Sequence, residues 1–424
     1  MRIKRFFIFL ALFSLIVEAK TFTLQDIKQM PTCLEKDYYI WRFISQPETT
    51  QQEAHDALVQ TSYINKLIAD AYKAKTGTMP KIGAFCKGDN CLPPPPSNEA
   101  IQASRHFSAG IKAIKAQDLQ KALSHFIYSK QTTDKPYDRD RATFWAYQIT
   151  KDKAYLDELL TSTDVNIYSL IAQDLANGHY PKTISPVFAA QYNNSFDTKD
   201  PLSWAQLKNQ VFSGKNDLNK LAESYAYEST AGHYAFIKSY ASQHKEKYYP
   251  LPYRNILQSL PTERQALIYA IARQESRFVP AAISRSFALG MMQIMPFLAK
   301  HIANKDGESI DLDDMFDPHK AIQYANRHLN YLNSNLYHPL FVAYAYNGGI
   351  GFTKRLIQRP DMFKTGPYEP YLSMETIENV ESREYGKKVL VNYVIYMNKL
   401  GIPTRILPLI NKLNDGTQID RFRN

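Results

Sequence analysis

The sequence predicts a mainly α protein with two helical parts, and three observations support this fold class. A chain of 424 residues with 44% hydrophobic content can bury more than one core. Short amphipathic patterns broken by polar turns follow one another over residues 98–244, which favours an α-helical superhelix or solenoid. A proline-punctuated segment then precedes a second run of helical patterns. We therefore predict a superhelical domain at 20–248, a mostly helical second domain at 249–405 and a C-terminal tail at 406–424.

Residues 1–19 have the pattern of a secretory signal peptide. A basic start precedes an apolar run from Phe6 to Val17, and the small residue Ala19 follows as the expected cleavage point. The run is too short to span a bilayer comfortably, although an uncleaved membrane anchor is the alternative interpretation. No Cys follows the run, which argues against a lipid anchor. We therefore expect an exported protein without a stable membrane span after cleavage.

The three cysteines are too few for a disulfide-built scaffold. Cys86 and Cys91 bracket the sequence KGDN and can close a small disulfide loop in an oxidising compartment, which leaves Cys33 over. The gap between them is longer than in the usual Cys-x-x-Cys metal knuckle. A disulfide is therefore favoured over a metal, and we expect no metal or cofactor. The proline run that follows marks a stiff break near 92–97.

The formal net charge of +10 stays positive after removal of the expected signal peptide. A basic exported protein suits an anionic polymer or surface. Nucleic acid is the competing partner, but lysine and arginine are scattered singly, with no basic helix, zinc knuckle or aromatic RNA-binding motif. We therefore expect no nucleic-acid partner.

The segment AQDLQKALSHFIYSK illustrates the helical pattern of the first part. Leu119, Leu123 and Ile127 recur at four-residue steps and predict the buried face of a helix. The repeats of this region are irregular and have no fixed period. A compact helical bundle therefore remains the alternative to a solenoid.

A helix in the second part is predicted to end in a carboxylate. Thr262 and Gln265 have capping-box spacing, which predicts that Thr262 caps the start of this helix. Leu267, Ile271 and Glu275 then fall at i, i+4 and i+8. Glu275 therefore lies close to the line of the apolar stripe rather than on the polar face.

A carboxyl group on an apolar face loses hydration, which disfavours its charged form and raises its pKa. A Glu that is protonated near neutral pH can act as a general acid on a glycosidic oxygen. The alternative is an ion pair of Glu275 with Arg273, Arg277 or Arg285, which would keep the carboxylate ionised. The spacing alone favours the ion pair.

Two further helix signals follow in the second part. Asp317 and Pro318 form a favourable N-cap and first-turn pair. An apolar helix then runs from Phe341 to Asn347 and into glycines that permit positive φ and close approach of another chain. A phosphate loop is not indicated, because a preceding strand and a following Lys-Ser/Thr are both missing. The alternative to a functional role for Tyr346 is a structural one, in which its ring packs in the core and its hydroxyl forms a hydrogen bond.

Four short motifs appear in order over about 110 residues of the second part. They are Glu275-Ser276 followed by Ser284, Gly290-Met291-Met292-Gln293, Ala345-Tyr346-Asn347-Gly348-Gly349, and Glu381-Ser382-Arg383-Glu384-Tyr385. In this order they resemble the soluble lytic transglycosylases, whose catalytic domain is goose-type lysozyme-like. The chain departs from the family pattern at Phe287, where the family often has Gly, and at Met291, where Leu is usual. The resemblance to the family's superhelical domain is weaker.

The resemblance implies a lysozyme-like domain in which Glu275 is the sole acid and base. It also implies that six residues hold the glycan strand or its peptide: Ser284, Gln293, Met295, Tyr346, Asn347 and Glu381. In this family Glu protonates the oxygen between N-acetylmuramic acid and N-acetylglucosamine, and its carboxylate then takes the proton of the muramoyl 6-hydroxyl. The expected partner is therefore peptidoglycan, in the periplasm of a Gram-negative bacterium.

Two alternatives to this function stay open. Glu381 can be the second carboxylate of a hydrolytic goose-type muramidase, because such glycosidases use paired carboxylates. The chain can also be a non-catalytic wall-binding helical scaffold, although the intact Glu275 argues against this.

Overall fold

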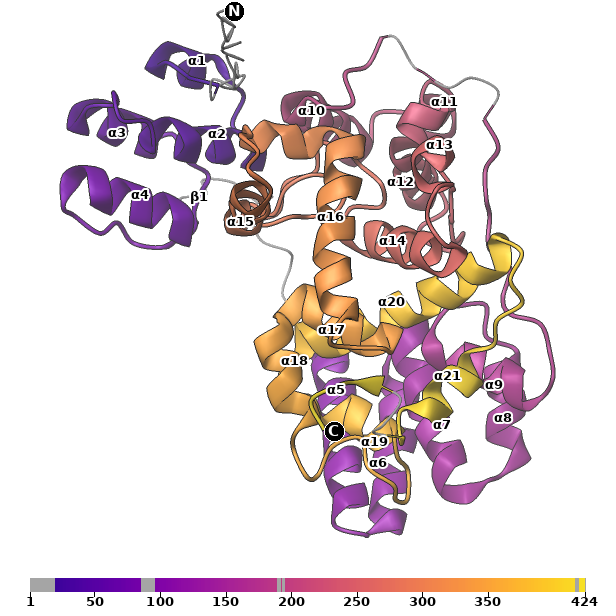
Figure 1. Cartoon of the computed structure of the whole chain (residues 1–424). Helices are drawn as coiled ribbons and strands as arrows, with labels where there is room; N and C mark the ends of the chain where they lie inside the picture. Colours follow the sequence, from indigo (N-terminus) through magenta and orange to yellow (C-terminus); the bar gives the residue numbers. More distant parts are fainter. Residues whose placement is uncertain (1–19, 85–95, 189–191, 193–194, 416–418, 424) are drawn as a thin grey trace, which may run out of the picture.

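The computed structural model of the chain describes residues 20–84, 96–188, 192, 195–415 and 419–423 (Figure 1). The expected signal peptide, the pair Cys86 and Cys91 and most of the proline run lie outside these residues. The described part is mainly α, as predicted, and its short strands β1 (Tyr63–Ile64) and β2 (Gly83–Ala84) pair antiparallel. No described helix has the length and apolar character that crossing a membrane requires.

The first group of helices, in indigo at the left of Figure 1, precedes the proline run. Its members are α1 (Leu24–Gln29), α2 (Leu34–Ile44), α3 (Gln51–Leu58) and α4 (Lys66–Thr76). The group is joined to the second half of the chain by charge, because Arg42 of α2 binds Asp311 at 2.7 Å and Asp313 at 2.9 Å.

The second group of helices forms the solenoid-like part of the chain, and each helix contacts the next. Its members are α5 (Asn98–Lys115), α6 (Leu119–Thr132), α7 (Pro136–Thr150), α8 (Lys153–Leu160) and α9 (Ile167–Leu175). Side chains of Ser97 and Asp118 cap α5 and α6 by accepting backbone N–H bonds. The sequential stacking confirms the solenoid-like prediction over the compact bundle.

The buried face of α6 differs from the predicted one. Leu119 is 37% exposed, and the buried positions are instead Ala122, Phe126 and Ser129. The reason lies on α5, where a Cβ on Gly110 would come within 2.6 Å of the Phe126 ring. Because Gly110 has no Cβ, the ring of Phe126 fills the space between α5 and α6. The side of α6 that carries Leu119 therefore faces away from α5.

The remaining helices make up the second half of the chain. They are α10 (Pro201–Phe212), α11 (Leu218–Glu223), η1 (Glu228–Thr230), α12 (Ala231–Ala241), α13 (Arg254–Leu257), α14 (Thr262–Glu275), α15 (Pro296–Asp306), η2 (Leu312–Phe316), α16 (Pro318–Asn333), α17 (Pro339–Gly348), α18 (Ile350–Ile357), α19 (Tyr371–Thr376), α20 (Val380–Lys399) and α21 (Ile406–Lys412). The long helix α20 crosses the middle of the molecule in Figure 1 and contacts α14, α17 and α9.

The capping box predicted at the start of α14 is wrong. The helix begins at Thr262 with Pro261 as its N-cap residue, so the Thr262 side chain caps nothing. The backbone N–H of Gln265 instead donates to the Pro261 carbonyl at 3.0 Å. By contrast, the Asp317 side chain caps α16 with Pro318 in the first turn, as predicted.

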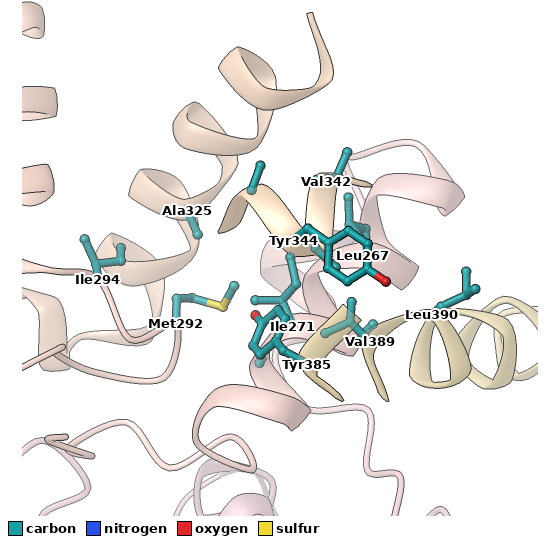
Figure 2. Close-up of a cluster of buried hydrophobic side chains, with 14 of the residues drawn as sticks. Leu267, Ile271, Met292, Ile294, Ala325, Val342, Tyr344, Tyr385, Val389 and Leu390 are labelled. Atoms are coloured by element: carbon teal, nitrogen blue, oxygen red, sulfur yellow. The ribbon is translucent and has the colours of Figure 1, made fainter. Parts of the chain in front are cut away.

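Figure 2 shows the apolar cluster in which α14 and α17 both pack against α20. Leu267 and Ile271 of α14 lie with Tyr344 of α17 and Val389 of α20, and all four are buried. Gly386 makes this packing possible, because a Cβ there would come within 2.1 Å of the Tyr344 ring. The cluster therefore fixes the C-terminal end of α14 relative to α20.

Helices of the predicted first domain also pack directly against the second. One hydrophobic core cluster includes residues from both, and α9 contacts α20 and α21. Helix α21 lies within the predicted C-terminal tail, and its Ile406 and Ile410 are buried. The domain boundaries themselves stay a prediction.

Candidate active site

Glu275 is the last residue of α14, and its side chain is partly buried. Leu267 and Ile271 precede it on the buried side of the same helix. The hydroxyl of Tyr385 on α20 donates a hydrogen bond of 2.6 Å to Oε1 of Glu275. The packing of α14 against α20 therefore brings a phenol to the carboxyl group.

Burial raises the pKa of Glu275 to about 7, which is the direction expected from its place on the apolar stripe. The hydrogen bond from Tyr385 lowers this pKa, and the nearby charge of Glu381 raises it. No arginine is among the groups that shift it. The guanidinium of Arg273 instead donates to the Tyr248 carbonyl and to Oδ1 of Asn392, both at 2.9 Å.

The segment after Glu275 turns sharply. Arg277 and Phe278 both have left-handed backbone conformations, with φ of 55° and 67°. Gly232 on α12 lies against this turn, because a Cβ there would come within 2.5 Å of the Phe278 carbonyl oxygen and 2.7 Å of that of Arg277. Ser276 fixes the turn from the other side, since its hydroxyl donates to the Met291 carbonyl at 2.7 Å. The position of Glu275 therefore depends on a glycine in another helix.

Three of the predicted site residues lie in the loop between α14 and α15. Ser284 accepts the backbone N–H of Ala288 at 2.9 Å, so its hydroxyl oxygen helps to close the loop. Gln293 donates to the carbonyls of Ala282 at 3.1 Å and Gly290 at 2.9 Å. Met295, the N-cap residue of α15, is partly exposed.

Gly290 fixes the middle of this loop. It has a φ of 73°, and a Cβ at this position would come within 1.9 Å of the Met315 carbonyl oxygen. Both the positive φ and the close approach of the Met315 carbonyl require a residue without a side chain. The presence of Gly290 in the second motif is therefore explained by the local backbone structure.

The other three predicted site residues lie together on α17 and α20. The hydroxyl of Tyr346 donates to the Met292 carbonyl at 2.8 Å, which joins α17 to the loop before α15. Nδ2 of Asn347 donates to Oε1 of Glu381 at 3.1 Å, and its Oδ1 accepts the Ser382 hydroxyl at 2.7 Å. Burial raises the pKa of Tyr346, and the charge of Glu275 raises it further.

Phe287 does not line the site, although it is close to Ser284 in sequence. Its side chain is fully buried and packs against Tyr38 and Trp41 of α2, with ring centroids 5.7 and 5.5 Å away. Its φ of 60° belongs to the left-handed region that favours glycine. The chain thus keeps the backbone turn and uses the added ring to bind α2.

The sequence-based set of site residues missed Tyr385, the direct hydrogen-bond partner of Glu275. The signal was present, because Tyr385 lies four residues after Glu381 in the last motif and therefore on the same side of a helix. A tyrosine at this position of a helix is also typical of core packing. The pattern alone therefore does not predict the hydrogen bond between Tyr385 and Glu275.

Residues 256–367 match the protein family described as Transglycosylase SLT domain. This range includes Glu275 and the motifs up to Asn347, and it ends before Glu381 and Tyr385.

Three solved structures are similar to the chain. An inactive variant of the lytic transglycosylase Slt from Pseudomonas aeruginosa is 16% identical, with 90% of this chain and 68% of that chain covered and a TM-score of 0.47. The 70 kDa soluble lytic transglycosylase from Escherichia coli is 18% identical, with 91% of this chain and 59% of that chain covered and a TM-score of 0.46. The 70 kDa enzyme in complex with bulgecin A has the same identity and coverage and a TM-score of 0.48.

Proposed function

We propose that the chain, whose residues 256–367 match the family described as Transglycosylase SLT domain, is a lytic transglycosylase that cleaves peptidoglycan without hydrolysis. It breaks the β-1,4 bond between N-acetylmuramic acid and N-acetylglucosamine and leaves a 1,6-anhydromuramoyl end. Glu275 is the acid and then the base of this reaction.

The observation that carries the proposal is the place of Glu275 at the end of α14, where its Oε1 accepts the Tyr385 hydroxyl at 2.6 Å. A carboxyl group with a pKa of about 7 is present in both protonation states near neutral pH. In the first step its proton passes to the glycosidic oxygen as the bond to C1 of the muramoyl residue breaks. In the second step the carboxylate takes the proton of the 6-hydroxyl while the oxygen of that hydroxyl bonds to C1. The carboxyl group is protonated again at the end.

A single carboxylate suffices for this reaction. Glycosidases that use water or a covalent intermediate normally need two carboxylates about 5–9.5 Å apart. In peptidoglycan the N-acetyl group of the muramoyl residue can stabilise the positive charge at C1, and its own 6-hydroxyl replaces water as the nucleophile. The substrate therefore supplies both missing groups.

The surrounding residues divide into two roles under this proposal. Ser284 and Gln293 shape the loop beside Glu275, because their polar atoms bind the backbone of that loop. Asn347 and Glu381 form a polar edge that can bind sugar hydroxyl or peptide groups. Met295 offers a partly exposed thioether at the start of α15 for apolar contact with the strand.

Hydrolysis is the second candidate function, and Glu381 is the observation that favours it. Its carboxylate is close enough to Glu275 for its charge to raise the pKa of Glu275. In a muramidase Glu381 would activate water in place of the 6-hydroxyl.

The site of action that fits this substrate is the periplasm of a Gram-negative bacterium. The expected signal peptide at residues 1–19 and the basic charge of the chain support export toward an anionic wall polymer.

The test of the function is Glu275→Gln, which keeps the shape of the side chain and removes its titrating proton. Turnover of peptidoglycan should fall by several decades, while binding to sedimented wall persists. Glu263→Gln is the matched control, because Glu263 is exposed in the first turn of the same helix. It should retain activity within about twofold. A Glu275→Gln protein within about tenfold of the unmodified activity would remove Glu275 from the mechanism.

A further inference from the structure

The first group of helices, α1 to α4, is bonded to a tight turn in the loop between α14 and α15. The turn runs from Ser284 to Phe287 and is closed by a backbone hydrogen bond of 2.8 Å from Phe287 to the Ser284 carbonyl. We refer to it as the Ser284 turn. Asn65, the N-cap residue of α4, is buried, and its Nδ2 donates to the carbonyl of Arg285 at 2.8 Å. The middle of the turn is therefore bonded to a residue 220 positions earlier in the sequence.

An aromatic contact holds the end of the same turn. Phe287 has a φ of 60°, in the left-handed region that a bulky side chain rarely adopts. Such a conformation persists where the surrounding structure fixes it. Here the Phe287 ring is fully buried and lies against Tyr38 and Trp41 of α2. The contact with α2 therefore stabilises a backbone conformation that is unfavourable for this residue.

Tyr38 connects this contact with a second one on the same loop. Its ring also lies against Phe316 of η2, with centroids 5.9 Å apart, and its hydroxyl donates to Oδ1 of Asp313 at 2.7 Å. The carbonyl oxygen of Met315 in η2 approaches Gly290 so closely that a Cβ there would lie 1.9 Å away. Helix α2 therefore supports the loop directly at the Ser284 turn and, through η2, at Gly290.

Backbone pairing connects the Ser284 turn to the rest of the loop. The N–H of Ser284 donates to the Ala288 carbonyl at 3.0 Å, and the N–H of Ala288 donates to the Ser284 hydroxyl oxygen at 2.9 Å. Leu289 then forms β-bridges with Ile283 on one side and Ile294 on the other. The turn and the segment between Leu289 and Ile294 therefore form one hydrogen-bonded unit.

This unit is bonded to the residues around the candidate acid. The carbonyl of Met291 accepts the hydroxyl of Ser276, the residue after Glu275, at 2.7 Å. The next carbonyl, that of Met292, accepts the hydroxyl of Tyr346 at 2.8 Å. A displacement of the loop would therefore be transmitted to both sides of the candidate site.

We infer that the first group of helices is part of the catalytic apparatus, with Asn65 and Tyr38 as positioning residues that hold the loop beside Glu275 in the geometry that turnover requires. This inference rests on the proposed function. Both side chains are buried, so they act through the loop rather than by touching the glycan strand. Because small misplacements of a site slow the chemical step, their loss should lower kcat more than it changes KM.

The test uses two variants of Asn65 that keep the cap of α4, in which Oδ1 accepts the Ile68 N–H at 2.9 Å. Asn65→Ser keeps a capping oxygen, but its shorter side chain cannot also reach the Arg285 carbonyl. Asn65→Asp keeps the cap and the shape and places an acceptor oxygen against that carbonyl. Tyr72→Phe on α4 is the matched control, because its buried hydroxyl bonds to Nδ1 of His55 at 3.2 Å within the first group of helices.

The kinetic readout is the division of the effect between kcat and KM on peptidoglycan. We expect kcat to fall about tenfold in Asn65→Ser and further in Asn65→Asp, with KM changed less than about threefold. Tyr72→Phe should keep kcat within about twofold. Unchanged kcat in both Asn65 variants, a loss confined to KM, or an equal loss in Tyr72→Phe would overturn the inference. If thermal melting shows that neither Asn65 variant folds, Tyr38→Phe replaces them with the same expectations, since it keeps the ring and loses the hydrogen bond to Asp313.

Hydrogen exchange tests the positioning of the loop without turnover. The backbone N–H groups of Ala288 and Ile294 should exchange about fivefold faster in Asn65→Ser than in the unmodified protein, while those of α14 keep their rates. Tyr72→Phe should change neither set. Unchanged exchange in the loop would contradict the inference, and so would faster exchange throughout the chain, which indicates lower global stability instead. Faster loop exchange in Asn65→Ser, combined with an unmodified protein that releases no product from peptidoglycan, would contradict the proposed function and leave the support of the loop by Asn65 intact.

Discussion

The hydroxyl of Tyr385 donates a 2.6 Å hydrogen bond to Oε1 of Glu275, across the contact between α20 and the end of α14. A hydrogen bond to a carboxylate stabilises its charged form, whereas burial and the charge of Glu381 act in the opposite direction. Burial is the largest effect, and the resulting pKa of about 7 lets one group give and take a proton near neutral pH. Burial therefore raises the pKa of Glu275, and the Tyr385 hydroxyl limits the rise.

Replacing Tyr385 with Phe removes the bond that favours the carboxylate, so the pKa of Glu275 should rise above about 7. In the proposed reaction Glu275 must be protonated for the first step, so we expect kcat/KM to fall as pH rises through this pKa. The alkaline limb of the pH profile should therefore move to higher pH in Tyr385→Phe. Measurement of kcat/KM from about pH 5 to 9 tests this shift.

The control for that measurement is Tyr396→Phe on the same helix. Its buried hydroxyl donates to the Pro250 carbonyl at 3.1 Å and has no contact with Glu275. This change should lower stability by about 1–3 kcal/mol without moving the pH profile. An alkaline limb that stays in place in Tyr385→Phe, or moves equally in both variants, would contradict the assigned role of Tyr385.

Gly232→Ala should damage the site from a distance. The added Cβ would meet the carbonyl oxygens of Phe278 and Arg277, and backbone cannot move aside as a flexible side chain can. We expect a stability loss of about 1–3 kcal/mol together with a lower kcat, because the turn that follows Glu275 must shift.

Gly351→Ala is the matched control, since the nearest atom to its new Cβ is the end of the Arg355 side chain at 3.5 Å. It lies in helix α18 and should be neutral or slightly stabilising. Thermal melting and turnover of both variants decide the question. A Gly232→Ala protein as stable and active as the Gly351→Ala protein would contradict the close approach of α12 to the turn.

Arg141→Met should be strongly destabilising. Arg141 of α7 pairs with Glu375, and both groups are buried with Lys387, which lies 3.3 Å from Glu375. Removal of the Arg141 cation leaves the buried Glu375 carboxylate without its full positive counter-charge. This should lower the free energy of unfolding by about 3–5 kcal/mol. Arg139→Met on the exposed side of the same helix should cost less than about 0.5 kcal/mol. Denaturant unfolding compares the two, and equal losses would refute a stabilising ion pair between α7 and α19.

The helical class and the clustering of the motifs could be predicted because they depend on local patterns. Leu267, Ile271 and Glu275 share a side of α14 through helical spacing alone, and desolvation then fixes the direction of the pKa shift. Helix starts were less certain, since Pro261 rather than Thr262 became the N-cap residue of α14.

The long-range partners could not be predicted, because nothing in a local pattern identifies them. Arg141 and Glu375 are 234 residues apart in the sequence, and Tyr385 is 110 residues from Glu275. Phe287 departs from the family pattern three residues after Ser284, and its ring packs on α2, a helix far away in the sequence. The exposure of Leu119 likewise depends on another helix, because Phe126 rather than Leu119 packs against Gly110 of α5.

The central claim is that Glu275 works with the 6-hydroxyl of the substrate and without water, and the products released from peptidoglycan test it most directly. Mass spectrometry should find 1,6-anhydromuramoyl ends with the unmodified mature protein. We expect the same ends at a reduced rate from the Glu381→Gln protein, because in the proposed mechanism Glu381 holds Asn347, whose Nδ2 donates to it at 3.1 Å, and does not activate water. Reducing ends from the unmodified protein that disappear in Glu381→Gln would contradict the claim and establish a two-carboxylate muramidase.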